Sequence, residues 1–256
     1  MKICTHAISH EVLVKLAGSE VDAIQVKGFV LPELADRLAR NILAQGYANY
    51  KNAPSIGRIG MAFYEAEGRP DLLATYFAQA GKHIEDLRER CAPLQSPIDV
   101  LRCRLDELWP AGAMLESLYG RKMYVGLSRV LEPGVTFLAH HDIFAKDAPD
   151  SFRAHGLQAQ FACNIYLSVP TEGGELFLWT REIPTDEFDA MRGSSYGIDP
   201  HVLGQPQIII QPNAGDLVIF NSRLMHAVTP GKEKPRLSLS CFVGYRGAAA
   251  PLTFWS

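Results

Sequence analysis

The feature that most limits the fold of this chain lies after Gly120, where short apolar runs alternate with turn residues. The separating segments read E-P-G, T-E-G-G, P-N-A-G-D and P-G-K-E-K-P, all of which are typical of turns. Many short strands with such turns predict an antiparallel sandwich or a jelly roll. The strands are expected at residues 122–131, 135–142, 157–169, 174–180, 207–212, 216–221, 225–230 and 236–245.

The part of the chain before Gly120 reads mainly as helix. Helices are expected to begin at Pro32, at Pro70 and at Ser96-Pro97, because proline suits a first helical turn and serine can cap it. A short fourth helix is expected at residues 111–119. The sequence therefore predicts an α+β fold in which an N-terminal helical elaboration precedes a β core.

The segment between the first two expected helices, N-A-P-S-I-G-R-I-G-M-A-F-Y-E-A, reads as a loop with a brief strand. Within the β part, residues 181–206 interrupt the series of strands and are long for a hairpin loop. Loops of that size are usually functional or disordered, so this insertion is a candidate lid. The alternative is a plain surface insertion. No linker divides the chain, and we expect one domain over residues 1–256, with 1–120 mainly helical and 121–256 forming the core.

Composition excludes several classes of partner. The net charge of −3 gives no excess of positive charge that would attract nucleic acid or an anionic membrane. No apolar stretch approaches the ~20 residues that span a bilayer, and the N-terminus is too polar for a secretory signal. The five cysteines include no C-x-x-C pair, so a reduced, cytoplasmic setting fits best. Composition leaves the oligomeric state open.

A candidate metal site stands in the run F-L-A-H-H-D-I-F. Side chains alternate along a strand, so His140 and Asp142 share one face and His141 points to the other. His226, from a later strand, can join them. Two imidazoles and a carboxylate on one face of a metal form the facial triad of non-haem Fe(II) oxygenases. The alternative is a strand-end hydrogen bond between His140 and Asp142, with His226 an ordinary core histidine.

Arg236 opens the last expected strand, ten residues after His226. A redox-active Fe(II) centre of this type needs electrons beyond those of its substrate, and a 2-oxo acid that chelates the iron can supply them. The remote carboxylate of such an acid needs a partner, and a guanidinium offers a bidentate one. Ser238 shares the strand face of Arg236 and can add a hydroxyl. The alternative for Arg236 is a surface charge.

The β part resembles the Fe(II)/2-oxoglutarate-dependent oxygenase superfamily. The matching motifs are H-H-D at 140–142, E-G-G-E-L at 172–176, P-N-A-G-D-L-V-I-F-N at 212–221, H-A-V at 226–228 and R-L-S at 236–238. The helical N-terminal half, G-R-I-G-M-A-F-Y-E and the ending T-F-W-S are similar to the carrier-independent branch, whose hydroxylases and halogenases act on amino-acid derivatives and alkaloids. The resemblance implies a double-stranded β-helix (jelly roll, cupin-like) core.

The resemblance also implies roles for single residues. It assigns His140, Asp142 and His226 to the metal and Arg236 to 2-oxoglutarate, with Ser238, Asn164 and Tyr124 as further contacts of this co-substrate. Halogenases of the branch carry a small residue where this chain has Asp142. The resemblance therefore implies hydroxylation of an unactivated sp3 carbon, with Fe(II), 2-oxoglutarate and O2. The small-molecule substrate is expected to be an amino acid or an amino-acid-derived natural product.

The sequence gives less information about the residues of the substrate pocket. By analogy with the branch, or by position near the metal motif, the candidate contacts are Ile59, Met61, Phe63, Phe144 and Trp179. For each of them the alternative is ordinary core packing. An acidic substrate would need an arginine, and the candidates are Arg58, Arg121, Arg153 and Arg223. For each arginine the alternative is a solvated charge.

Other functions stay open from sequence alone. The same cofactors also support desaturation, cyclisation or epimerisation. A jelly-roll module that binds a metal and senses a ligand without turnover belongs to another class. A zinc hydrolase could use His, His and Asp, but it needs a general base that the sequence does not mark.

Overall fold

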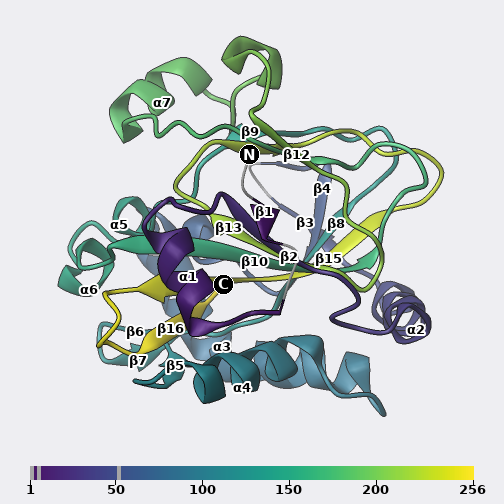
Figure 1. The fold of residues 1–256 in the computed structure, drawn as a ribbon, viewed down its shortest axis with the longest axis horizontal. Helices are drawn as coiled ribbons and strands as arrows, with labels where there is room; N and C mark the ends of the chain where they lie inside the picture. The colour runs from purple at the N-terminus through teal and green to yellow at the C-terminus, as the bar shows by residue number, and fades with distance from the viewer. Residues whose placement is uncertain (1–2, 5–6, 51–52) are drawn as a thin grey trace.

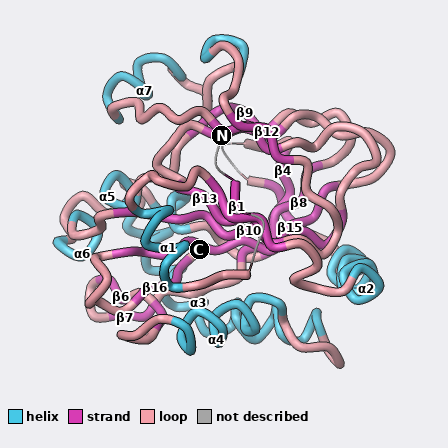
Figure 2. The backbone as a smooth tube through the Cα atoms, viewed as in Figure 1, coloured by secondary structure: helices cyan, strands magenta, loops and turns pink. Residues whose placement is uncertain are grey.

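The structure is a computed structural model, and it describes residues 3–4, 7–50 and 53–256. The fold is mixed α+β, with two main sheets and helices around them (Figures 1 and 2). The larger sheet has the order β1-β2-β13-β10-β15-β8-β4-β3, and β16 and β5 extend it from β15. The smaller sheet has the order β12-β11-β14-β9, and β6 pairs with β7 apart from both. The strands are β1 Ile3–Cys4, β2 Ala23–Val26, β3 Ala48–Asn49, β4 Ile56–Ile59, β5 Ala113–Leu115, β6 Ser117–Leu118, β7 Arg121–Lys122, β8 Leu127–Leu131, β9 Phe137–His140, β10 Ala159–Ser168, β11 Leu176–Leu178, β12 Ile208–Ile210, β13 Leu217–Asn221, β14 His226–Val228, β15 Arg236–Tyr245 and β16 Leu252–Trp255.

Proline begins three of the helices, as the sequence predicts. Pro32, Pro70 and Pro97 each occupy the first turn, where a missing N–H has no cost. The Ser96 hydroxyl makes no capping hydrogen bond, so that detail of the prediction was wrong. Among the described residues, no helix is both long and apolar enough to cross a membrane. The helices are α1 His10–Ala17, α2 Pro32–Ala44, η1 Phe63–Ala66, α3 Pro70–Cys91, α4 Pro97–Leu108, α5 Phe144–Asp147, α6 Phe152–His155, α7 Thr185–Arg192 and η2 Pro200–Leu203.

The larger sheet separates two hydrophobic cores. On one face, alternate residues such as Phe161 and Cys163 of β10 pack against α1, α2, α3 and α4. On the other face, Ala162 and Tyr166 of β10 pack with Leu176 and Val228 of the smaller sheet. Figure 1 shows α3 and α4 on the side of the larger sheet that faces away from β9 and β12. The interior between the two sheets is therefore filled largely by apolar and aromatic side chains.

The strands predicted after Gly120 are present, with two differences. The run 122–131 is not one strand, because β7 ends at Lys122 and β8 begins at Leu127, with Gly126 at φ +112° between them. A further strand, β16, pairs with the end of β15. The prediction of a mainly helical part over 1–120 was incomplete. Strands from this part lie at both ends of the larger sheet, where β2 pairs with β13 and β4 pairs with β8.

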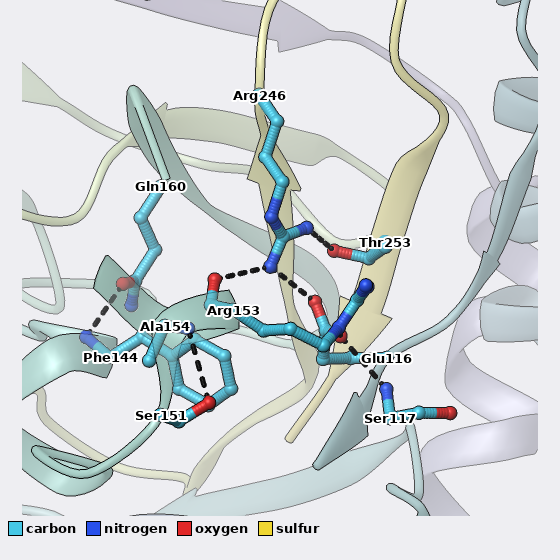
Figure 3. Close-up of polar contacts among 9 residues, drawn as sticks. All are labelled: Glu116, Ser117, Phe144, Ser151, Arg153, Ala154, Gln160, Arg246 and Thr253. Atoms are coloured by element: carbon cyan, nitrogen blue, oxygen red, sulfur yellow. Dashed lines mark hydrogen bonds and ion pairs between the residues drawn. The ribbon is translucent and has the colours of Figure 1, made fainter. Parts of the chain in front are cut away.

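The predicted helix at 111–119 was wrong. This segment forms β5 and β6, and β5 pairs in parallel with β16 near the C-terminus. Glu116, fully buried, lies between two arginines: its Oε1 accepts from Arg153 Nε and its Oε2 from Arg246 Nη2, each at 2.7 Å (Figure 3). A carboxylate bound to distant elements in this way holds the segment extended, so tertiary contacts outweigh its helical propensity.

The insertion 181–206 contains α7 and η2 and joins the smaller sheet through a bridge between Ala139 and Ile198. Figure 1 shows α7 beyond the edge of the molecule that carries β9. The side chains of Ile183, Phe188 and Ile198 form a small core with Ala139 of β9. The insertion is therefore an ordered element packed beside the strand that carries the H-H-D motif.

Candidate metal centre

Strand pairing brings the three candidate metal ligands together. β9 and β14 are antiparallel neighbours in which His140 lies opposite His226. Asp142 follows the end of β9, where its backbone N–H donates to the carbonyl of Ser222 at 2.8 Å. One ligand atom from each of His140, Asp142 and His226 lies within 4.8 Å of the others. The predicted triad is therefore assembled in the fold.

The protonation of the triad suits a cation. The carbonyl of Leu138 accepts from His140 Nδ1 at 2.8 Å, and that of Leu224 accepts from His226 Nδ1 at 3.0 Å. Since a carbonyl only accepts, each Nδ1 carries the proton and each Nε2 presents a lone pair. Burial, and then the nearby His226, lower the pKa of His140 to about 3, so this ring is neutral at physiological pH.

The acid of the triad completes this donor set. His226 Nε2 lies 3.4 Å from Asp142 Oδ2, and this oxygen is buried without a hydrogen-bond partner. Burying imidazole lone pairs and a carboxylate that face one another, with no proton between them, is unfavourable unless a cation lies between them. Two imidazoles and one carboxylate are the donor set of a facial Fe(II) site, so the residues present fit this metal.

A cavity adjoins the triad. Its volume is about 110 Å³, several times the roughly 10–15 Å³ that one water needs. Three members of the insertion, Phe188, Arg192 and Tyr196, form part of its wall. The full lining is Tyr50, Tyr64, Glu67, Arg129, Phe137, His140, His141, Asp142, Ile143, Lys146, Asp147, Phe188, Arg192 and Tyr196.

Arg236 lies inside the fold rather than on the surface. Its residue exposure is 6 %, and it faces the interior between the sheets from the start of β15. Its guanidinium lies over the ring of Tyr166, 4.8 Å from the centroid, and Nη2 donates to the phenol oxygen at 3.2 Å. Nε is buried without a partner. A buried cation with free donor capacity fits an anionic ligand.

The other predicted 2-oxoglutarate contacts differ in placement. Ser238 and Asn164 share the inner face with Arg236, and Asn164 Oδ1 accepts from Ser240 Oγ at 2.7 Å. Asn164 lines a second, smaller cavity, and Arg129 lines both this cavity and the one beside the triad. Tyr124 lines neither, since it is fully buried against Tyr76 and His83.

None of the predicted substrate contacts lines the cavity. Met61 and Phe63 are buried in the core between the sheets, and Ile59 packs against the outer core. Phe144 is buried and stacks on Trp255 at 4.3 Å, although its neighbours in the chain reach the cavity. Trp179 belongs to the small core of the insertion, where its indole N–H donates to the carbonyl of Gly204.

The charged candidates are placed elsewhere too. Arg223 lies 4.0 Å from Glu182 and is not among the lining residues. Arg58 pairs with Glu65, and Arg153 pairs with Glu116. The geometry therefore does not support these arginines as substrate contacts, because each is outside the cavity and Arg58, Arg153 and Arg223 already have acidic neighbours.

The sequence interpretation did not identify several residues of the site. Arg129 is the one charged residue of β8, which reads L-S-R-V-L, and this signal could have found it. Tyr166 escaped because its contact with Arg236 depends on the register of β10 and β15. His141 was expected on the opposite face, away from the site. It lines the cavity instead, with its ring 4.3 Å from that of Phe188 and neither ring nitrogen bonded.

The triad, the adjoining cavity and the buried arginine lie between two sheets of mainly antiparallel strands. This arrangement is typical of a non-haem iron oxygenase site. Comparison with known families agrees, because residues 125–244 match the model of the 2OG-Fe(II) oxygenase superfamily. Residues 125–244 therefore resemble this superfamily, whose metal and co-substrate are Fe(II) and 2-oxoglutarate, and the triad of His140, Asp142 and His226 fits such an iron site.

Two curated relatives resemble the chain over part of their length. An L-gamma-glutamyl-L-propargylglycine hydroxylase of Streptantibioticus cattleyicolor is 32% identical over 163 residues, which cover 62% of this chain and 59% of the relative. An L-isoleucine 3(1)-dioxygenase of Pantoea ananatis is 31% identical over 134 residues, which cover 49% of this chain and 44% of the relative. The chain thus spans about half the length of these relatives.

Solved structures support the fold. The structure of an N-substituted L-amino acid dioxygenase from Burkholderia ambifaria superimposes with a TM-score of 0.63 at 15% sequence identity, covering 96% of this chain and 91% of the other. At this identity the likeness shows the shared fold alone.

Proposed function

We propose that this chain is an Fe(II)- and 2-oxoglutarate-dependent dioxygenase that hydroxylates an unactivated sp3 carbon of a small molecule, an amino acid or an amino-acid-derived natural product. The observation that carries the proposal is the triad of His140, Asp142 and His226 beside an open cavity. The names of both curated relatives, a hydroxylase and a dioxygenase of amino-acid compounds, support this substrate class.

Arg236 is proposed as the anchor of the remote carboxylate of 2-oxoglutarate. Among the described residues, its buried guanidinium has one hydrogen bond, to Tyr166, and its Nε has no partner. Tyr166 and Ser238 can add hydroxyl donors on the same face, and Asn164 lies one residue pair further along the strands. Tyr124 is the weakest of the proposed contacts, because its side chain lines neither cavity.

When bound, the iron and 2-oxoglutarate supply the oxidising chemistry, in which O2 and 2-oxoglutarate give succinate, CO2 and one oxygen atom for the C–H bond. The residues of the chain do the positioning. His140 and His226 are held by Leu138 and Leu224 in the tautomer that leaves Nε2 free. Asp142 supplies a carboxylate where a halogenase needs an open position, so hydroxylation is favoured over halogenation.

The insertion 181–206 is proposed as a lid, since Phe188, Arg192 and Tyr196 close one wall of the cavity. Shielding the site from water protects the reaction from wasteful side steps. We further propose that residues 1–256 act as one domain with a double-stranded β-helix core, in a reduced, cytoplasmic setting and without a nucleic-acid or membrane partner.

Product mass and succinate release together test the function. The chain, loaded with Fe(II) under reducing conditions, is incubated with 2-oxoglutarate, O2 and a panel of amino acids and derivatives. Hydroxylation gives succinate and a product heavier by one oxygen. A product lighter by two hydrogens indicates desaturation or cyclisation, and an unchanged mass with inverted stereochemistry indicates epimerisation. No succinate across the panel favours a ligand sensor, and zinc-dependent hydrolysis favours a hydrolase.

A further inference from the structure

Arg129 places a positive charge in the wall of the cavity beside the metal triad. It lies on β8 between Leu127 and Leu131, whose side chains belong to the core between the two sheets. Because side chains alternate along a strand, Arg129 faces the same interior. It lines the cavity together with His140 and Asp142. A molecule that enters this cavity therefore meets a guanidinium close to the metal ligands.

The guanidinium of Arg129 has no acidic partner. Within the described part of the chain it forms no ion pair, and its Nε is buried without a hydrogen-bond partner. The ring centroid of Phe137 lies 5.8 Å away, a favourable contact that leaves the charge in place. Burial lowers the pKa of Arg129, but the nearby Tyr50 and Asp142 outweigh this effect and raise it. The side chain is therefore a permanent, uncompensated cation.

A second arginine lies directly opposite Arg129 on the neighbouring strand. β4 and β8 pair so that Arg58 and Arg129 are partners in the register. Like charges in this position destabilise a sheet. Arg58 is compensated, because its Nη2 lies 2.9 Å from Glu65 Oε2, and it is not among the residues that line the cavity. One carboxylate for two facing cations leaves an excess positive charge on the side of the cavity.

The acids that line the cavity do not balance Arg129. Asp142 belongs to the metal triad, where its carboxylate is a ligand. Burial, and then the charges of Asp142 and Glu67, raise the pKa of Asp147 well above its ordinary value, which favours its uncharged form. Glu67 is exposed, so water and salt screen its charge. The positive charge of Arg129 thus stays available to a ligand.

The other cations of the cavity already share an acid. Lys146 Nζ and Arg192 Nε each lie 2.6 Å from Asp189 Oδ1. Arg192 Nη1 also donates to the carbonyl of Ser195 at 2.7 Å. Of the lysine and arginine side chains that line the cavity, Arg129 is therefore the one without an ion pair in the described part of the chain.

Under the proposed function, both carboxylates of 2-oxoglutarate already have partners. One chelates the iron together with the keto oxygen, and the remote one pairs with Arg236. Arg236 is not among the residues that line the cavity, whereas Arg129 shares the cavity with Phe188 and Tyr196 of the insertion. A charge held away from bulk water is unfavourable unless an opposite charge pairs with it. The anion that Arg129 requires is therefore left to the substrate.

We propose, resting on the proposed function, that Arg129 binds the carboxylate of the substrate. The substrate is then an amino acid or derivative whose carboxylate is free, neither esterified nor amidated. The planar guanidinium can hold a carboxylate through two parallel hydrogen bonds. The phenol of Tyr50, which lies near Arg129 and lines the same cavity, can donate to the same group. Arg129 thereby fixes one end of the substrate in the cavity that adjoins the triad.

Calorimetric titration under anaerobic conditions tests this inference on the full chain loaded with Fe(II) and 2-oxoglutarate. The probes are the proteinogenic L-amino acids and their carboxamides, which keep the shape of the acid and lose its negative charge. The tightest ligand is expected to be an acid, and amidation should weaken its binding at least about tenfold.

Three variants complete the experiment. Arg129→Met should weaken binding of that acid about 30-fold or more and change binding of its carboxamide less than about twofold. Arg129→Lys keeps the charge without the planar fork, so its affinity for the acid should lie between those of Arg129→Met and the wild type. Arg37→Met, the same type of change at an exposed position of α2, is the matched control and should bind the acid as the wild type does.

Each outcome decides the inference. Equal binding of acid and carboxamide, wild-type affinity for the acid in Arg129→Met, or no binding by any acid would overturn it, and the comparison on the unaltered chain needs no variant to fold. A larger rise in the Kd of 2-oxoglutarate than in that of the acid also overturns it and assigns Arg129 to the co-substrate. Succinate release with the same probes separates the inference from the proposed function. Turnover of carboxamides alone rejects the carboxylate site and keeps the oxygenase, whereas carboxylate-dependent binding without any succinate does the reverse.

Discussion

Arg236→Met removes the proposed anchor of 2-oxoglutarate while keeping a side chain of similar length in the interior. Removing one partner of a desolvated charge pair costs about 2–5 kcal/mol. At about 1.4 kcal/mol per factor of ten, the Kd of 2-oxoglutarate should rise about 30-fold to several thousand-fold. Tyr166→Phe removes only one neutral hydrogen bond, the 3.2 Å contact to Nη2, and about 0.5–1.5 kcal/mol predicts a rise of about 2- to 12-fold.

Calorimetry with 2-oxoglutarate gives these Kd values directly, and initial rates of succinate release give the two KM values. The fold should persist in Arg236→Met, because an apolar residue in place of a buried charge is often neutral for stability. The KM of the proposed amino-acid substrate should change far less than that of 2-oxoglutarate. An equal rise in both, or a smaller effect than Tyr166→Phe, refutes the assignment. A larger effect from Arg129→Met would move the anchor to Arg129, which lines both cavities.

Further predictions concern the metal, the buried acid and the insertion. Asp142→Ala should weaken Fe(II) binding by more than about 100-fold, because changes even to groups that only orient the ligands lower metal affinity by about 10- to 100-fold. The variant should also lose hydroxylation, and near-native turnover would show that Asp142 is not part of the triad. Glu116→Gln should lower the free energy of unfolding by about 3 kcal/mol at neutral pH, measured with denaturant. Burial alone raises the pKa of Glu116, but the hydrogen bond from Arg153 and the charge of Arg246 outweigh it, so its pKa is lowered from 4.5. Its stabilisation is therefore present above that pH, and the gap to the variant should close as pH falls below it; a gap independent of pH contradicts this reading. Phe188→Ala should speed hydrogen exchange of the α7 amides at least about tenfold. It should also raise the amount of succinate formed per molecule of product, and an unchanged ratio of succinate to product would argue against a lid.

The fold after Gly120 was predictable because its signals are local. Apolar runs and turn motifs mark most strands of this part, although β16 was not predicted, and β10 and β15 were expected to within two residues of their observed limits. The strands before Gly120 were not predictable in the same way. β2 is four residues long and pairs with β13, nearly two hundred residues away, and β5 pairs with β16. Short strands of this kind depend on a partner that no local pattern reveals.

The candidate site shows the same division. His140, Asp142 and His226 could be predicted, because strand periodicity and a metal's preferred ligands restrict the choice. The wall of the cavity could not, since Glu67 and Phe188 come from separate segments that only tertiary packing unites. The aromatic residues predicted as substrate contacts are not among those that line this cavity, because the core between the sheets uses the same residue types for packing.

The most direct test of the central claim is a labelled-oxygen measurement. The Fe(II)-loaded chain is incubated with 2-oxoglutarate, a free L-amino acid panel and ¹⁸O₂, and both succinate and product are analysed by mass spectrometry. An oxygenase that hydroxylates its substrate gives one succinate for each product, with label in both. Label in succinate alone, or a product whose oxygen comes only from water, would contradict the account.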